Sequence, residues 1–291
     1  MTTDHRFPRE DAQRVVQTAL GEDLGDGADV TTTATIPADQ VTRSAVVARA
    51  PGVVAGLPVI ELVLAAVADR LGAAAPSVEL LSADGVRVER GDRLATLVGS
   101  TQVTLVAERT ILNILCRTSG VATHTRRWAD ALAGTRALVL DTRKTTPGMR
   151  ALEKYAVRCG GGTNKRMGLY DVAMIKDNHK LAAGGLSAAY AAVRSRFPTV
   201  DIQVEATTTA EALEAVAAGA RFLLLDNMSP ATLADTVAAV RATGERVELE
   251  ATGGLTLEVA REYAETGVDY LSVGGLTHSS PILDIALDLD V

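Results

Sequence analysis

The chain has 291 residues, 47% of them hydrophobic and 3% aromatic, and its formal net charge is −7. This length allows one large or two modest domains with a substantial core, whereas the acidic balance and the scarcity of aromatic side chains argue against a nucleic-acid-binding protein. No apolar run reaches membrane-spanning length and the charged N-terminal segment lacks the apolar core of a signal peptide, so we expect a cytoplasmic protein that contacts no membrane.

The first half of the chain alternates between helical and extended patterns. Apolar positions recur at helical spacing over residues 9–20, and a turn-rich stretch follows over 21–37. A β-branched run predicts a strand over 42–55, and proline opens a predicted helix over 58–71. Further short strands and then two helices are predicted at residues 78–81, 86–88, 94–98, 103–118 and 122–132.

The positions of the cysteines and lysines argue against a disulfide framework, a zinc site and a biotinyl or lipoyl carrier. Cys116 and Cys159 lie far apart without a CxxC or Cys–His cluster, so neither a disulfide framework nor a zinc site is predicted. The segment DGVRVERGDRLATLVG is similar to the β-sandwich of biotinyl and lipoyl carriers, which attach their cofactor to a lysine. No lysine precedes Lys144, so we interpret this segment as structural.

A basic stretch follows the predicted helices and dominates the charge pattern. Between Arg109 and Lys180, fourteen Lys and Arg residues oppose five Asp and Glu residues, and all five lysines of the chain lie within residues 141–180. A cationic cluster in an acidic protein predicts a local anion-binding site, and its Gly, Thr and Pro neighbours place it at segment ends. The alternative interpretation is a solvated basic helix face.

Beyond residue 137 the pattern changes to apolar strands separated by Ala-rich helices. Strands are predicted at residues 137–141, 172–176, 201–205, 221–226, 246–250 and 269–274. Helices are predicted at residues 148–159, 185–196, 209–218, 230–243 and 256–266. Such alternation predicts a parallel sheet covered by helices, and six units would form a small or incomplete α/β barrel.

Each of the six predicted strands ends in charged or glycine-rich sequence. In α/β barrels the loops that follow the strands converge on one face, so these residues are predicted to share a site. They are Asp141, Arg143, Lys144, Lys176, Asp177, Glu205, Asp226, Asn227, Glu250, Thr252, Gly253, Gly254, Gly274, Gly275 and His278.

The residue types at this edge predict a polyanionic ligand. Glycine pairs late in a barrel bind phosphate through backbone N–H groups, and Glu205 and Asp226 offer the oxygen ligands that Mg²⁺ prefers. Five cationic side chains would neutralise further anionic groups, and the two arginines suit bidentate capture of a carboxylate or phosphate. These five are Arg143, Lys144, Lys165, Arg166 and Lys176.

Several long motifs in this order resemble the quinolinate phosphoribosyltransferase family, also called carboxylating nicotinate-nucleotide pyrophosphorylases. They are DTRKTTPG, KYAVRCGGGTNKRMGLYDVAMIKDNH, EATGGL and SVGGLTHS. EDLGDGADVTT, ERTILNILCRTSGVAT and PILDIALDL are also similar, so the resemblance covers essentially the whole chain.

The resemblance implies a fold and an activity. An N-terminal open α/β sandwich would occupy residues 1–115, an incomplete α/β barrel residues 116–279, and residues 280–291 would return to the first domain. The enzyme, a pentosyltransferase of NAD biosynthesis, would transfer ribose 5-phosphate from phosphoribosyl pyrophosphate to quinolinate, releasing pyrophosphate and CO₂. It would act as a homodimer that shares each site between subunits.

The resemblance also implies roles for individual residues. Arg143 and Arg166 would hold the quinolinate carboxylates, and the partner subunit would contribute Arg109. Lys144 and Lys176 would contact substrate and diphosphate. Glu205 and Asp226 would serve the ribose and Mg²⁺. Phosphate would be bound by Thr252, Gly253, Gly254, Gly274, Gly275 and His278.

One departure from the family pattern bears on the substrate. Lys165 stands where the family usually has His, whereas Thr252 for Ser and Gly275 for Ala are mild changes. Lys165 would be a substrate-binding residue of altered reach and charge, so an alternative is a phosphoribosyltransferase for another aromatic acid. More distant alternatives are a Schiff-base aldolase using Lys176 and a catalytically silent nucleotide-binding protein.

Overall fold

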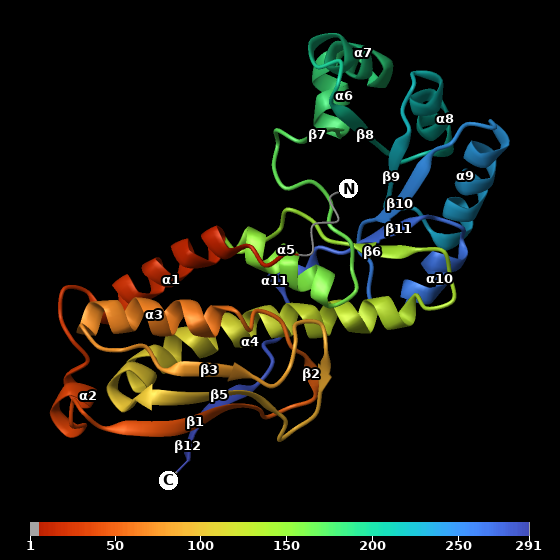
Figure 1. The fold of residues 1–291 in the computed structure, drawn as a ribbon. Helices are drawn as coiled ribbons and strands as arrows, with labels where there is room; N and C mark the ends of the chain where they lie inside the picture. The colour runs from red at the N-terminus through yellow and green to blue at the C-terminus, as the bar shows by residue number, and fades with distance from the viewer. Residues whose placement is uncertain (1–5, 291) are drawn as a thin grey trace. The chain divides into compact units, whose positions relative to one another are not determined.

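The computed structural model describes residues 6–290, and residues 1–5 of the charged N-terminal segment and Val291 lie outside this range. Contacts divide the chain into two compact units (Figure 1). The barrel unit consists of Arg127–Lys144 and Gly162–Gly274. The sandwich unit consists of the chain up to Arg126, the segment Thr145–Gly161, and the chain from Gly275 onward.

The sandwich unit contains an antiparallel sheet with the strand order β12-β1-β5-β3. Its strands are β1 (Val41–Ala48), β3 (Ser77–Leu80), β5 (Arg93–Ser100) and β12 (Ile285–Asp290), and a second small sheet pairs β2 (Gly52–Val53) with β4 (Arg87–Val88). The helices are α1 (Arg9–Leu24), α2 (Val30–Thr35), α3 (Val59–Leu71), the greater part of α4 (Thr101–Ala131), α5 (Arg150–Cys159) and α11 (Gly275–His278). Figure 1 shows α3 and α4 against one face of the larger sheet, where their apolar side chains form one core cluster with β1 and β5.

Two local features of the sandwich unit differ from the sequence-based expectations. The turn-rich stretch contains α2, because the Asp29 carboxylate accepts hydrogen bonds from the backbone N–H groups of Thr31 and Thr32, both at 3.0 Å. The predicted strand over residues 42–55 is two strands in different sheets, interrupted around Pro51. Proline lacks the N–H group that would continue the ladder.

The two helices predicted at residues 103–118 and 122–132 are in fact the single helix α4. The prediction separated them around Gly120, a residue that weakens an isolated helix. In the structure a Cβ atom at Gly120 would lie 2.1 Å from the Pro281 carbonyl oxygen. Glycine is required there by the close approach of another segment, and the helix continues through it.

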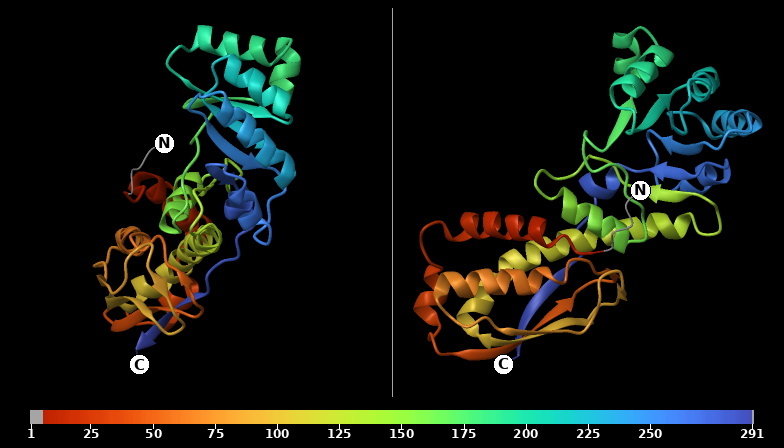
Figure 2. Two further views of the ribbon diagram at one scale, coloured as in Figure 1. Left: turned by 90° about the vertical axis from the view of Figure 1, so that its right-hand side faces the viewer. Right: turned by 45° about the horizontal axis from the view of Figure 1, so that its top comes forward.

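The barrel unit contains the six-stranded parallel sheet that the alternation predicted, with the order β6-β11-β10-β9-β8-β7. The strands are β6 (Leu138–Leu140), β7 (Val172–Ile175), β8 (Asp201–Ala206), β9 (Phe222–Asp226), β10 (Glu248–Thr252) and β11 (Tyr270–Ser272). The helices between them are α6 (Asp177–Ala183), α7 (Leu186–Arg196), α8 (Thr209–Ala217), α9 (Pro230–Ala242) and α10 (Ala260–Glu265). Figures 1 and 2 show helices along the outer face of the curved sheet.

The barrel is incomplete, as predicted. Strands β6 and β7 form the two edges of the sheet. Thr163 partly extends the β6 edge, because its N–H group donates to the Val139 carbonyl at 2.8 Å and its carbonyl accepts from the Asp141 N–H group at 3.1 Å. This short pairing brings the segment after Gly162 to the carboxyl end of β6.

Two further findings concern the chain as described. Cys116 and Cys159 are both free, in agreement with the absence of a predicted disulfide. Among residues 6–290, no helix combines the length and apolar character that crossing a membrane requires.

Candidate active site

The register of the parallel sheet places acidic side chains at one level of the barrel interior. Leu224 on β9 pairs with Glu205 on β8 and with Glu250 on β10. Asp226 and Thr252 pair with each other two residues further along their strands. Because side chains two residues apart share a face of the sheet, these groups all point to the same side near the carboxyl ends of the strands.

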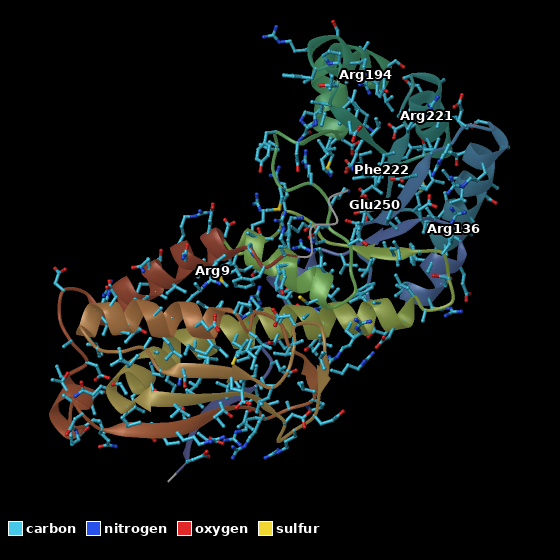
Figure 3. The ribbon with its side chains drawn as sticks, viewed as in Figure 1. Arg9, Arg136, Arg194, Arg221, Phe222 and Glu250 are labelled. Carbon is cyan, nitrogen blue, oxygen red and sulfur yellow. The ribbon has the colours of Figure 1, made fainter. Side chains whose placement is uncertain are left out.

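An aromatic pair lies beneath this level. Phe222 and Tyr270 are stacked with ring centroids 5.7 Å apart, and Phe222 belongs to an apolar cluster with Leu140 and Leu224. Figure 3 labels Phe222 and Glu250 on the neighbouring strands β9 and β10. The site therefore has an apolar floor and a charged upper layer.

Glu205 and Asp226 bring two carboxylates together at the ends of β8 and β9. Burial and then the negative charge of Glu205 raise the pKa of Asp226 above its ordinary value. The Lys176 ammonium donates to Glu205 Oε2, and the Asn227 amide donates to Asp226 Oδ2 at 2.7 Å. Because burial and a neighbouring negative charge disfavour the ionised form of Asp226, a cation beside these two carboxylates would be stabilising.

Asp141 organises the loop that carries two of the predicted site residues. Its carboxylate accepts a hydrogen bond from the Asn164 side chain at 2.6 Å and one from the Lys165 backbone N–H group at 2.8 Å. Asp141 is fully buried, so these bonds are shielded from water. This loop therefore holds Lys165 and Arg166 in a fixed position relative to β6.

Lys165 points into the barrel interior. Its ammonium nitrogen lies 2.6 Å and 2.5 Å from the two carboxylate oxygens of Glu250, and also 5.8 Å from the centre of the Phe222 ring. Burial lowers the pKa of Lys165, and the Glu250 charge opposes that shift. The predicted contact of this ammonium with a substrate thus competes with a contact that is already made within the protein.

Arg143 follows β6 and Arg166 follows Lys165, and the two side chains lie close enough for their charges to interact. Burial and then the charge of Arg143 lower the pKa of Arg166. The Arg166 guanidinium donates to the Val172 carbonyl at 3.0 Å, whereas the Nε and Nη1 groups of Arg143 are buried without a hydrogen-bond partner. Buried donors of this kind are rare in folded proteins, and a bound anion would satisfy them.

The glycine-rich loop after β10 is shaped by a close backbone approach. Gly253 has φ +94°, and a Cβ atom there would lie 2.3 Å from the side-chain oxygen of Asn227. The Asn227 N–H group donates to the Thr252 carbonyl at 2.9 Å, which joins this loop to the end of β9. The predicted phosphate-binding residues Thr252, Gly253 and Gly254 therefore lie directly beside Asp226.

The structure assigns the remaining predicted residues to different places. Lys144 is exposed after β6 and Gly274 follows β11, both in the barrel unit. Arg109 on α4, with Gly275 and His278 of α11, belongs to the sandwich unit, and the side chains of Arg109 and His278 are exposed. Eleven of the fourteen predicted residues thus lie in one unit, namely Arg143, Lys144, Lys165, Arg166, Lys176, Glu205, Asp226, Thr252, Gly253, Gly254 and Gly274.

Sequence reasoning did not assign roles to three residues that organise this edge, namely Asp141, Lys180 and Glu250. Lys180 donates to the Glu205 carbonyl at 3.2 Å and to Glu211 at 3.0 Å, which fastens α6 to β8. Asp141 and Glu250 carried a signal, since both end predicted strands. Their partners, however, come from a loop whose path the sequence pattern does not reveal.

The donor set for a metal ion is small. Within residues 6–290 no group of three or more His, Cys, Asp or Glu side chains is arranged to hold a metal. Glu205 and Asp226 nevertheless match Mg²⁺, which proteins typically hold by one or two carboxylates together with substrate phosphates. The two carboxylates therefore offer the kind of oxygen donors that a magnesium ion prefers.

Comparisons with known proteins match this chain from end to end. A model of the quinolinate phosphoribosyl transferase N-terminal domain matches residues 29–119, and a model of the C-terminal domain of the same family matches residues 121–288. A nicotinate-nucleotide pyrophosphorylase [carboxylating] from Mycobacterium leprae (strain TN) is 46% identical over 99% of this chain and 100% of its own length. A quinolinate phosphoribosyltransferase [decarboxylating] from Nicotiana glauca is 40% identical over 97% of this chain and 83% of its own length.

Solved structures are similar over the same extent. The nicotinate-nucleotide pyrophosphorylase from Francisella tularensis superposes with a TM-score of 0.92 at 32% identity and covers 100% of both chains. NadC from Streptococcus pyogenes superposes with a TM-score of 0.90 at 34% identity over 99% of this chain and 98% of its own.

Proposed function

The chain belongs to the quinolinate phosphoribosyltransferase family, and on this premise we propose that it transfers the phosphoribosyl group of phosphoribosyl pyrophosphate to the ring nitrogen of quinolinate. With loss of CO₂ the products are nicotinate mononucleotide and pyrophosphate, a step of NAD biosynthesis. The observation that carries this proposal is the match of both family domains, together with 46% identity over 99% of the chain to a carboxylating relative.

Arg143 and Arg166 bind the two carboxylates of quinolinate in this proposal. The unpartnered N–H groups of Arg143 support the assignment, because a carboxylate would satisfy both of them at once. Arg166 is held by Asp141 through the loop and by the Val172 carbonyl. The two guanidinium groups fix the acceptor ring with its nitrogen towards the carboxylate pair.

Phosphoribosyl pyrophosphate lies across the ends of β7 to β11. Lys144 and Lys176 contact its diphosphate, while the loops at Thr252–Gly254 and Gly274 bind the 5-phosphate through backbone N–H groups. Glu205 and Asp226 hold Mg²⁺, which supplies positive charge to the departing pyrophosphate. The raised pKa of Asp226 supports this placement, because a cation there would offset both the burial and the Glu205 charge that disfavour the ionised carboxylate.

Catalysis by these residues is mainly electrostatic and positional. Glu205 and Asp226 lie where positive charge develops on the ribose as the pyrophosphate leaves, and Lys176 balances negative charge on that leaving group. The stacked rings of Phe222 and Tyr270 form an apolar floor beneath these carboxylates. We expect decarboxylation to follow transfer, because the ribosylated ring nitrogen offsets negative charge on the adjacent carbon. Release of CO₂ without the phosphoribosyl donor would refute that order.

Lys165 motivated the alternative of another aromatic acid as acceptor. Two hydrogen bonds join its ammonium to Glu250, so the charge that was expected to alter recognition is balanced within the protein. The identity to carboxylating relatives also favours quinolinate. We therefore retain quinolinate as the acceptor.

The assembly and location follow from the same proposal. The enzyme acts as a homodimer in the cytoplasm, and Arg109 of one subunit completes the quinolinate site of the other. The exposed position of Arg109 on α4 supports a role at a subunit interface.

The experiment that tests the function is a defined reaction. Purified protein, Mg²⁺, phosphoribosyl pyrophosphate and quinolinate should yield nicotinate mononucleotide and one equivalent of CO₂, detected by mass spectrometry and from carboxyl-labelled quinolinate. Chelation of Mg²⁺ should abolish product formation. Nicotinate in place of quinolinate serves as the control, and faster turnover of nicotinate would contradict the proposal.

A further inference from the structure

The Lys165–Glu250 pair is a buried ion pair in the barrel unit, close enough to Arg166 for their charges to interact. The Lys165 side chain is 5% exposed and that of Glu250 is fully buried. The ammonium lies within 2.6 Å of both carboxylate oxygens, so each charge has a close partner of opposite sign. A charge in such surroundings is costly when its partner is removed.

The pair is held from both sides. The Asp141 carboxylate accepts the Lys165 backbone N–H group and the Asn164 amide, which fixes the chain from which the ammonium extends. Glu250 lies inside β10, between β9 and β11. If Lys165 turned towards a substrate carboxylate, it would leave the Glu250 charge buried and uncompensated.

The two arginines differ from Lys165 in this respect. Arg143 carries two buried N–H groups without a partner, so an incoming carboxylate gains contacts and breaks none. Lys165 would have to exchange one carboxylate for another. The acceptor is therefore expected to be bound at the arginines.

We propose that Glu250 is a positioning residue that balances the charge of Lys165 beside the acceptor site. The pair then carries no net charge, and Lys165 makes no contact with the acceptor. The inference rests on the proposed function, since it takes quinolinate as the acceptor. It assigns recognition of the two carboxylates to Arg143 and Arg166, and it explains how a lysine can occupy this position without adding a net charge to the site.

The test measures quinolinate affinity by calorimetry in K165M, E250Q and the double variant K165M/E250Q. K165M leaves the Glu250 carboxylate uncompensated below a dianion, so its Kd for quinolinate should rise about tenfold or more. The double variant removes both charges while keeping similar shapes, and its Kd should return to within about threefold of the wild-type value. E250Q should bind quinolinate at least as tightly as the wild-type protein, because the freed ammonium can meet the ligand.

Direct recognition by Lys165 predicts a different result. K165M and the double variant would then lose affinity equally, and that outcome would overturn the proposal. An unchanged Kd in K165M would overturn it as well. If K165M fails to fold, the double variant alone decides, because direct recognition predicts weak binding for it and the proposal predicts near wild-type binding.

The controls separate this inference from the function itself. R221M removes a charge from an exposed ion pair with Glu245 in the same unit and should leave quinolinate affinity unchanged. Circular dichroism and thermal unfolding establish that each variant is folded. A wild-type protein that binds quinolinate but forms no nicotinate mononucleotide would contradict the proposed function while leaving the affinity comparison intact.

Discussion

At the scale of single residues, the site contains polar groups whose surroundings would become more favourable if a ligand were bound. Arg143 is the clearest case, because two of its N–H groups are buried and unpaired. Asp226 is the second, because burial and then the nearby carboxylate of Glu205 raise its pKa. Both conditions cost free energy in the absence of ligand and are relieved by an anion and a cation respectively.

R143K should weaken quinolinate recognition selectively. Lysine keeps the charge but loses the forked pair of donors, so a charge-assisted contact of about 1.5–3 kcal/mol is lost and KM for quinolinate should rise about tenfold to a hundredfold. KM for phosphoribosyl pyrophosphate should change little. R221K, at an exposed ion pair, is the matched control for steady-state kinetics. Equal increases in both KM values would show that Arg143 acts on the whole site.

Mg²⁺ affinity should depend on pH through Asp226. Because the pKa of Asp226 is raised, protons compete with the cation at a higher pH than for an ordinary aspartate, and the apparent Kd for Mg²⁺ should increase as the pH falls. The stability of the metal-free protein should change with pH in the opposite direction. Because the folded state binds this proton more readily than the unfolded state, the contribution of Asp226 to the free energy of unfolding grows as the pH falls through its raised pKa. Magnesium titrations monitored by initial rate at several pH values measure the first effect. D226N should bind Mg²⁺ weakly and with a flatter pH dependence.

At the scale of elements, the Lys180 side chain joins α6 to β8 and α8. The Lys180 ammonium contacts Asp177 within α6 at 2.7 Å, Glu211 on α8 at 3.0 Å and the Glu205 carbonyl on β8 at 3.2 Å. Burial lowers the pKa of Lys180, but hydrogen bonds to Asp177 and Glu211 outweigh it and raise the pKa overall. These contacts connect the carboxyl end of β8 to α6 and α8.

K180M should loosen α6 and lower activity. Losing the charged hydrogen bonds should reduce the free energy of unfolding by about 2 kcal/mol, measured by urea denaturation, and speed amide exchange in α6. The raised pKa means that this contribution is present at neutral pH and is lost as the pH rises through the folded-state pKa, so the wild type and K180M should converge at strongly alkaline pH. R196M, in the last turn of α7, is the control. Unchanged stability in K180M at neutral pH would contradict this role.

The elements also show what the sequence could predict. Sequence periodicity predicts the six apolar strands, their order along the chain and the charged residues at their ends. It can do so because a buried strand is visible in its own run of apolar residues. The continuity of α4 and the Lys165–Glu250 contact cannot be predicted in this way. Gly120 indicates a helix break until the approach of Pro281 is known, and nothing in the sequence pairs Lys165 with Glu250 until the loop path anchored by Asp141 is known. Contacts between distant segments leave no periodic signal.

At the scale of the whole molecule, the barrel unit contains most of the predicted site, and Arg109 belongs to the sandwich unit. The proposed homodimer would complete each site with an arginine from the partner. Such an arrangement makes each active site depend on two chains. Mixing two inactive variants tests this dependence, and sedimentation measures whether the protein is a dimer.

Mixed dimers should recover activity lost in each parent. R109A and E205Q homodimers should both be nearly inactive. After unfolding and refolding as an equimolar mixture, half of the dimers are mixed and each has one intact site, so activity should reach about a quarter of the wild-type level. Sedimentation at the assay concentration establishes the dimer. No recovery in a mixture shown to contain mixed dimers would place Arg109 in the site of its own chain.

All five lysines lie within residues 141–180, so reagents that modify lysine side chains report on this one region. Lys154, Lys165 and Lys180 are buried, so an amine-selective reagent should reach only Lys144 and Lys176 besides the terminal amine. Both reachable lysines lie at the proposed diphosphate site. A fluorescent succinimidyl ester would therefore act as an active-site label without any engineering, and protection by phosphoribosyl pyrophosphate would report occupancy directly. Coupling the enzyme to an amine-reactive resin through either lysine would, for the same reason, inactivate it.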